Sequence, residues 1–446
     1  RITNHSVWEE MTSINGIRMK SPSLTMGSEL ANSVFLWALS LCFAPFMYFL
    51  ALTVSREKRK LKEVMKTMGL RDAAFWLSWG LLYTIYISIP SMVLTFCLKA
   101  TYFYLTSNSI LFVLLFLYGI SSICLCFMLS SLLKKPRTTS FVIFIFTFCL
   151  GALNITTTIR LIPPSLELIL SIFCPFAFGA GLSKVLYFQK YGRTFDFTDL
   201  MLEPYGYCLL IDSVLYMLLA FYFDKVVPDK YGVPYPPLFF LKKTYWCKPK
   251  SPYTGNVPTS EWSHGSIFSD NTEPVPPEFD GKEAIRLNNI KKNYKMKSTE
   301  EEALKGLSLD IYEGQITAIL GHSTSGKTTL LNILSGLSKP SDGFASIFKY
   351  NVWEKEHMEK IWEISAICPK WNIQFEFLTV RENLKTFAKI KGIPSNAVEK
   401  EVEKLLTLLD IKAIQNTQAN HLSGGQKRKL SLGITLLGEP QVNPLL

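Results

Sequence analysis

The sequence predicts a multi-span bundle of membrane α-helices followed by a soluble α/β domain of the P-loop type. Hydrophobic residues make up 48% of the 446 residues and charged residues only 19%, a balance typical of membrane proteins. Apolar runs long enough to cross a bilayer fill residues 30–225. A glycine-rich loop between a strand pattern and a helix pattern then stands within residues 283–446.

The charges and the cysteines argue against two other classes of protein. A net charge of +11 would suit a nucleic-acid partner, but the basic residues cluster beside apolar runs, as in the cytosolic loops of membrane proteins. No nucleic-acid partner is therefore expected. The nine cysteines form no C-x-x-C pair and are scattered through apolar stretches. They are expected to be small core residues rather than a disulfide frame or a metal site.

Five membrane crossings are predicted, and basic loops set their direction. The basic stretches at 55–72 and 134–138 are expected in the cytosol. Residues 1–29, with a glycosylation sequon at Asn4, are then the end of an extracellular domain, and everything after Lys225 is cytosolic. The expected spans are Leu30–Val54, Ala73–Leu98, Ser109–Leu133, Thr139–Ile155 and Tyr205–Phe223.

Two features interrupt this pattern. Prolines and glycines break or flank the apolar segment within residues 163–186, so we expect a re-entrant helical pair on the outer side rather than a sixth crossing. Asp212 lies within the last span. It either marks a substrate path or, as we favour, is a hydrogen-bonded carboxylate near the interface.

The basic stretch after the first span has a helical apolar stripe. Leu61, Val64, Met65 and Met68 recur at helical spacing on one face. Such a helix either lies along the cytosolic membrane surface or packs against protein in a cytosolic loop, and the sequence leaves both open.

The soluble half begins after a linker at 226–282, which is rich in proline, glycine and tyrosine. The run Gly321-His322-Ser323-Thr324-Ser325-Gly326-Lys327-Thr328, followed by Thr329, matches G-x-x-x-x-G-K-[ST]. A buried strand is expected before it at Gln315–Leu320, and a helix after it at Lys327–Leu337. The loop would surround phosphates with N–H groups, Lys327 would neutralise them, and the Thr328 hydroxyl would bind Mg²⁺.

A second motif, Leu422-Ser423-Gly424-Gly425-Gln426, stands about 95 residues beyond Lys327 and precedes a helical run. A serine cap followed by two glycines offers bare N–H groups at a helix start, which suits a second phosphate-binding surface.

The two motifs resemble the Walker A loop and the signature of an ATP-binding cassette (ABC). Three stretches resemble subfamily A, in the branch of members six, eight, nine and ten: the run from Arg56-Glu57-Lys58 to Trp79, the linker Tyr231-Gly232-Val233-Pro234-Tyr235-Pro236, and Gly321-His322. The resemblance implies an ATP-driven transporter of lipids or sterols, with ATP and Mg²⁺ as cofactors. It also implies a second cassette half as partner, in the same full-length protein or in another chain.

The resemblance carries over to further positions. Tyr294 matches the aromatic residue that stacks on adenine. Thr379-Val380-Arg381-Glu382 matches the start of the helical subdomain that contacts the membrane domain, and it also has the pattern of a capping box.

Three departures from the family pattern affect the expected chemistry. Thr324 stands where the family has glycine. A β-branched threonine would strain the loop if φ is positive at this position. Lys370 stands at the position of the glutamine that contacts Mg²⁺ and the attacking water. Residues 441–446 end the chain before the Walker B acid, so a truncated cassette is expected. The alternative to a transporter is therefore a non-hydrolysing isoform with a regulatory or dominant-negative role.

Overall fold

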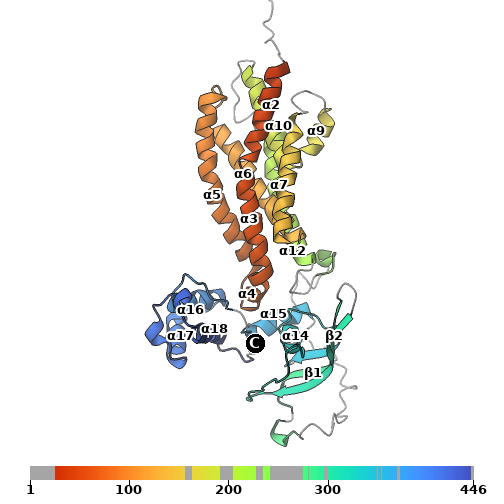
Figure 1. Ribbon diagram of the computed structural model, residues 1–446, viewed down its shortest axis with the longest axis vertical. Helices are drawn as coiled ribbons and strands as arrows, with labels where there is room; N and C mark the ends of the chain where they lie inside the picture. The colour runs from red at the N-terminus through yellow and green to blue at the C-terminus, as the bar shows by residue number, and fades with distance from the viewer. Residues whose placement is uncertain are drawn as a thin grey trace, which may run out of the picture. The chain divides into compact units, whose positions relative to one another are not determined.

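The computed structural model divides the chain into two compact units (Figure 1). One unit contains residues 1–52, 81–129 and 137–219, and the other contains residues 53–80, 130–136 and 220–446. We call them the membrane unit and the cytosolic unit. The structure describes residues 26–155, 163–190, 204–227, 235–241, 275–279, 281–295, 300–348, 350–352, 354–368 and 372–442.

Long apolar helices running in roughly the same direction make up the membrane part (Figure 1). Four described stretches are long and apolar enough to cross a bilayer: Leu30–Glu57, Asp72–Thr101, Asn108–Leu132 and Tyr205–Val226. The helices concerned are α2 (Met26–Leu41), α3 (Ala44–Glu57), α5 (Asp72–Thr101), α6 (Asn108–Leu132) and α12 (Pro204–Val226). The remaining expected span corresponds to α7 (Pro136–Ala152), whose 17 residues reach only roughly 25 Å. The five-crossing topology stays a prediction.

The segment expected as a re-entrant pair consists of two helices, α9 (Pro164–Leu170) and α10 (Cys174–Lys190), with a three-residue break between them. Two tyrosines of α12 hold this region. The Tyr216 hydroxyl donates to the Ile172 carbonyl at 2.6 Å, within the break, and the Tyr205 hydroxyl donates to Glu167 Oε1 at 2.5 Å. These bonds satisfy polar groups where the helix is interrupted. Whether the pair returns to the outer side stays a prediction.

Asp212, one turn before Tyr216 on α12, differs from its expected environment. Its Oδ2 atom is buried and has no hydrogen-bond partner among the described residues. The expected hydrogen bond is therefore wrong for this oxygen, whereas the position of Asp212 near the interface stays a prediction. Asp212 is only 2% exposed, a degree of burial that sequence position alone does not reveal.

In the cytosolic unit, an antiparallel sheet has the strand order β2-β1-β3-β4. Its strands are β1 (Glu283–Lys295), β2 (Glu300–Tyr312), β3 (Asp342–Ile347) and β4 (Tyr350–Asn351). Two helices, α14 (Lys327–Leu334) and α15 (Lys355–Ile364), contribute Leu330, Ile333 and Ile361 to the buried cluster that lines this sheet.

The buried strand expected at Gln315–Leu320 is absent from the structure. The segment has no regular secondary structure, and the Ile316 and Leu320 side chains are 102% and 91% exposed. A strand of a parallel sheet needs hydrogen-bonded neighbours. The described sheet offers only antiparallel pairs, and the bridge between Ser365 and Val442 is the parallel contact that the structure records outside it. Without a neighbouring strand the apolar run cannot bury its side chains.

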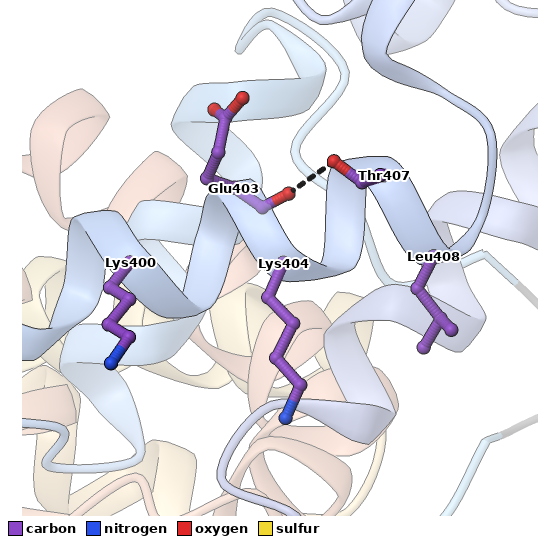
Figure 2. A pocket seen from close by; sticks show the side chains of 5 residues that line it. All are labelled: Lys400, Glu403, Lys404, Thr407 and Leu408. Atoms are coloured by element: carbon purple, nitrogen blue, oxygen red, sulfur yellow. Dashed lines mark hydrogen bonds between the residues drawn. The ribbon is translucent and has the colours of Figure 1, made fainter.

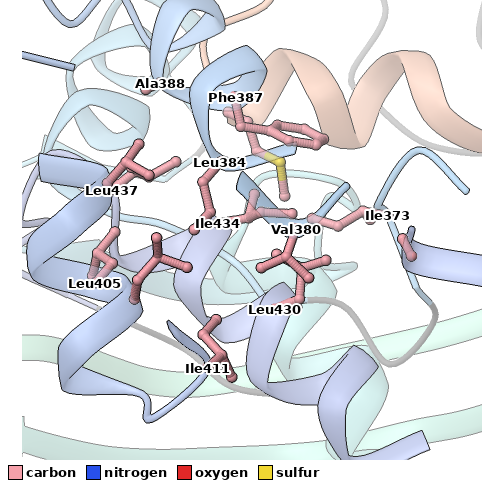
Figure 3. Packing of buried hydrophobic residues seen from close by; sticks show 14 of the residues in the cluster. Ile373, Val380, Leu384, Phe387, Ala388, Leu405, Ile411, Leu430, Ile434 and Leu437 are labelled. Carbon is pink, nitrogen blue, oxygen red and sulfur yellow. The ribbon is translucent and has the colours of Figure 1, made fainter. Parts of the chain in front are cut away.

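Three helices form a second core in the cytosolic unit, which we call the helical core (Figure 3). They are α16 (Val380–Ile390), α17 (Ser395–Leu408) and α18 (Gly424–Leu436). Phe387, Leu405 and Ile434, one from each helix, are fully or nearly fully buried in it. The expected capping box at the start of α16 is confirmed: the Glu382 N–H donates to Thr379 Oγ1 at 3.2 Å, and the Thr379 N–H donates to Glu382 Oε2 at 2.8 Å.

The apolar stripe after the first span packs into the helical core. The chain continues from α3 through a π-helix, η1 (Lys58–Lys62), into α4 (Glu63–Thr67). Val64 and Met68 are only 2% and 3% exposed, and they belong to the same buried cluster as Leu384 and Phe387. Of the two alternatives that the sequence left open, packing against protein is the one that the structure shows for these residues.

A buried ion cluster joins the segment before α4 to α5 and α12. Lys58 Nζ lies 3.0 Å from Asp224 Oδ1, Lys62 Nζ pairs with Asp224 Oδ2, and Lys62 Nζ lies 3.4 Å from Asp72 Oδ1. The Lys62 ammonium also faces Trp76, 5.1 Å from its ring centroid. With the Lys62 side chain 2% exposed and that of Asp224 7% exposed, each charge depends on its partners.

Replacing Asp224 with asparagine should strongly destabilise the cytosolic unit. The Asp224→Asn variant leaves two buried ammonium groups short of a counter-charge, which costs about 3–5 kcal/mol for a buried pair. The measurement is the thermal unfolding midpoint of the purified chain in detergent. Asp342→Asn is the matched control, because the Asp342 carboxylate is 68% exposed and lies 3.9 Å from Lys291 Nζ, a pairing worth under about 1 kcal/mol. Equal midpoints for the two variants would contradict the burial of the cluster.

Candidate nucleotide-binding site

The predicted phosphate loop leads into α14 as its motif requires. Gly326 precedes the first residue of α14 with φ of 86°, in the left-handed region. A Cβ atom at this position would stand 2.4 Å from the Ala303 carbonyl oxygen of β2, so only glycine fits without displacing the strand. The loop is therefore held against β2 at the point where the helix begins.

Lys327 lies with its ammonium group inside the loop. Its Nζ donates to the Gly321 carbonyl at 2.6 Å and to the His322 carbonyl at 2.7 Å, and lies 3.2 Å from Ser325 Oγ. The residues at both ends of the motif thus surround one positive charge at the start of a helix. This arrangement concentrates positive potential where an anion would bind.

Thr324 has the positive φ at which the sequence predicts strain. Its φ is 73°, in the left-handed region that a β-branched residue avoids. The expectation of strain at the position where the family has glycine is confirmed.

The hydroxyl expected to bind Mg²⁺ is available. Thr328 is exposed in the first turn of α14, next to Lys327. Among the residues that the structure describes, no group of three His, Cys, Asp or Glu side chains could hold a metal ion. Mg²⁺ commonly binds with few protein ligands together with phosphate oxygens and water, so a single hydroxyl fits a metal that arrives with a nucleotide.

Tyr294 is placed near the loop by the pairing of two strands. Its side chain is 40% exposed on β1, and Lys292 Nζ lies 5.2 Å from its ring centroid. Lys292 pairs with Leu304 of β2, the residue after Ala303, against which Gly326 lies. The exposed aromatic face is thus two residues along β1 from the pair that supports the loop. Its role as the adenine contact stays a prediction.

The second motif forms the start of α18. The Ser423 N–H donates to Gln426 Oε1 at 2.9 Å, and the Gln426 N–H donates to Ser423 Oγ at 3.3 Å, which completes a capping box. Apart from the chain neighbours and the backbone of α18 itself, no described atom lies within 4 Å of the place where a Cβ of Gly424 or Gly425 would stand. Leu422 is instead buried in the helical core. The motif therefore presents an open backbone surface at its two glycines, and the burial of Leu422 anchors it to the helical core.

Lys370 and Gln374 lie between the two motifs in the sequence. Lys370 lies outside the described residues, so its expected role stays a prediction. Gln374, four residues later, is buried and accepts a hydrogen bond from Ser431 Oγ of α18 at 3.0 Å. Sequence reasoning missed this contact, because nothing in the local pattern around Gln374 indicates a partner 57 residues away.

Sequence reasoning also missed Lys391, the residue that caps α16. Its Nζ donates to the Thr435 carbonyl at 2.9 Å and to the Leu437 carbonyl at 2.8 Å, at the end of α18. Burial lowers the pKa of the Lys391 ammonium to about 8. A lysine near a helix end is a recognisable signal, but the sequence placed Lys391 at the end of α16. It did not indicate that the lysine contacts α18.

A shallow surface pocket lies apart from the predicted site. Figure 2 shows it along one face of α17, where Lys400, Glu403, Lys404, Thr407 and Leu408 line it. The Thr407 hydroxyl donates to the Glu403 carbonyl of the same helix at 2.9 Å. None of these residues belongs to either motif, and we assign this pocket no role in nucleotide binding.

Comparisons with known proteins cover both parts of the chain. The family model described as ABC-2 family transporter protein matches residues 10–222, and the model described as ABC transporter matches residues 304–445. Among solved structures, the dimeric ATP-binding cassette MJ0796 bound to ADP and Pi is 27% identical over 36% of this chain and 72% of its own, with a TM-score of 0.34.

Curated relatives match the chain almost from end to end. Over 99% of its length it is 44% identical to "ABC-type organic anion transporter ABCA8B" of Mus musculus and 46% identical to "ATP-binding cassette sub-family A member 6" of Homo sapiens. It is 44% identical to "Cholesterol transporter ABCA5" of Homo sapiens over the same share. The chain spans 28%, 28% and 27% of these relatives.

Replacing Thr324 with glycine should tighten ATP binding. The Thr324→Gly variant removes the left-handed strain, about 1–2 kcal/mol for an L-residue, which corresponds to a gain of roughly 5-fold to 30-fold in affinity. The measurement is the dissociation constant of a fluorescent ATP analogue with the chain in nanodiscs. Thr324→Ala serves as control, because alanine keeps the Cβ atom and most of the strain. A gain of the same size in both variants would assign the effect to the lost hydroxyl or methyl group instead.

Proposed function

Because this chain belongs to subfamily A of the ABC transporters, we propose that it uses ATP bound at the Lys327 loop to drive lipids or sterols across a membrane. The observation that carries this proposal is the packing of α4 into the helical core. Val64 and Met68 follow directly after the first apolar span, yet their burial partners come from the helix bundle that contains the signature.

A contact of this kind supports mechanical coupling. The side chains of α4 share one closely packed cluster with α16, α17 and α18, and such interiors transmit displacement rather than absorb it. The ion cluster at Lys62 and Asp224 fixes the end of the π-helix before α4 to the end of α12. A change at the signature would thus reach the ends of two apolar helices.

The positions of the side chains support the nucleotide roles that we propose. Lys327 would place its charge on the β- and γ-phosphates, and Tyr294 would stack on the adenine. Mg²⁺, held by the Thr328 hydroxyl, would supply charge neutralisation at the phosphates. The open Gly424–Gly425 backbone at the start of α18 would close over ATP held by the second cassette half, which we propose as the partner.

We infer an amphiphilic, largely apolar substrate. Relatives that share 44% identity with this chain are named as transporters of organic anions and of cholesterol. In the described part of the chain, α5 exposes a long apolar stripe that includes Leu77, Leu81, Ile85 and Ile89. Such a surface belongs in lipid or against further membrane segments. A lipid or sterol fits both observations better than a freely soluble anion does.

The test is transport by the full-length protein reconstituted in vesicles. ATP should drive movement of a fluorescent sterol or phospholipid between leaflets, and Lys327→Ala should reduce this rate by about 10²–10³-fold, as for the loss of a charge-stabilising group. Lys339→Ala, which removes an equal charge outside the motif, should leave the rate unchanged. ATP-driven transport of an organic anion without lipid movement would contradict the proposed substrate. Equal rates with Lys327→Ala would contradict the proposed use of ATP.

A further inference from the structure

Lys391 joins two helices that meet at their C-terminal ends. It follows the last residue of α16, and its Nζ donates to two carbonyls at the end of α18, those of Thr435 and Leu437. The last carbonyls of a helix have no donor within the helix, and they carry the negative end of its dipole. An ammonium group therefore satisfies both the hydrogen bonding and the charge at this end of α18.

Burying the Lys391 ammonium group costs free energy, because the charge loses its hydration. Burial is the cause of the lowered pKa of Lys391, and among the described residues no carboxylate forms an ion pair with it that would offset the loss of water around the charge. An apolar side chain could fill the same space without that loss. The two carbonyls of α18 are the contacts that distinguish lysine from such a residue.

The backbone around Lys391 also lies against the end of α4. Gly69 follows α4 with φ of 97°, and a Cβ atom there would stand 3.1 Å from the Ile390 carbonyl oxygen and 3.3 Å from Lys391 Cα. This approach is too close for another residue to adopt without movement of α16. One residue, Lys391, thus lies beside Gly69, two residues after α4, through its backbone and contacts α18 through its side chain.

We propose that Lys391 is a positioning residue that links the α4 segment to the signature helix. Any displacement of α4 moves the turn at Ile390 and Lys391, and the lysine carries the movement to the end of α18. Since α18 is a rigid rod of roughly 20 Å, its other end, with Ser423 to Gln426, moves too. This inference rests on the proposed function, because it assigns a route for the coupling between membrane segment and signature.

The experiment measures amide hydrogen exchange along α18 in the full chain in nanodiscs, without nucleotide. Gly69→Ala perturbs the contact with α16 through both its φ and its new Cβ, and should raise exchange in α18 by about tenfold. Lys391→Met keeps the length of the side chain but not its two bonds, and should raise exchange by a similar factor. If Lys391 is the link, adding Gly69→Ala to Lys391→Met should raise it no further.

Controls separate a link from general loosening. Lys391→Arg, which retains a charged donor, should restore the response to Gly69→Ala. Lys389→Met, which removes an exposed lysine from the same helix, should behave like the unmodified chain. Exchange in β1 and β2 should stay constant in every variant, which excludes global unfolding. Additive effects of Gly69→Ala and Lys391→Met would overturn the proposal, as would an unchanged α18 after Gly69→Ala. These outcomes do not depend on transport, so they remain distinct from failure of the proposed function.

Discussion

The burial of one apolar helix face organises the cytosolic unit. Val64 and Met68 are buried in the helical core, in the same cluster as Leu384 and Phe387. Burying two such side chains stabilises the unit by about 3–6 kcal/mol. This contact draws the end of the first apolar stretch to the helices that carry the signature. The buried pairs of Lys58 and Lys62 with Asp224 then fix that same stretch to α12.

Packing and charge act differently at this junction. The apolar contacts provide the free energy, whereas a buried ion cluster of this kind contributes little net stability and instead penalises any other arrangement. Lys62 has partners on both α5 and α12, so moving either helix alone would take away one of the two carboxylates that face this buried charge. The junction therefore favours movement of its helices as one body, which is what coupling to a nucleotide site requires.

Local patterns in the sequence predicted local structure well. The long apolar helices, the capping box at Thr379, the serine cap at Ser423 and the strain at Thr324 all depend on residues close in sequence.

Features that depend on distant partners were not predictable in the same way. The prediction of a strand at Gln315–Leu320 was wrong because strand formation needs neighbouring strands. The basic run at 55–72 contains two lysines whose carboxylate partner is about 160 residues away, and the local sequence does not indicate that partner. The apolar face of α4 fitted a membrane surface and a protein core equally, because periodicity does not identify the partner. The sequence placed Lys391 at the end of α16, and its hydrogen bonds to α18 arise only in the fold.

The most direct test of the central claim is the chemical accessibility of Met68. In a Met68→Cys variant of the chain in nanodiscs, the introduced thiol should react with a maleimide at least about tenfold more slowly than that of Arg59→Cys, because the reaction requires opening of the helical core. Arg59 is exposed on the preceding π-helix, which makes it a matched reference. Adding Phe387→Ala to Met68→Cys should raise the rate, since removal of the ring loosens the cluster. Equal, fast reaction at both positions, unaffected by Phe387→Ala, would show that α4 does not pack into the helical core and would contradict the account.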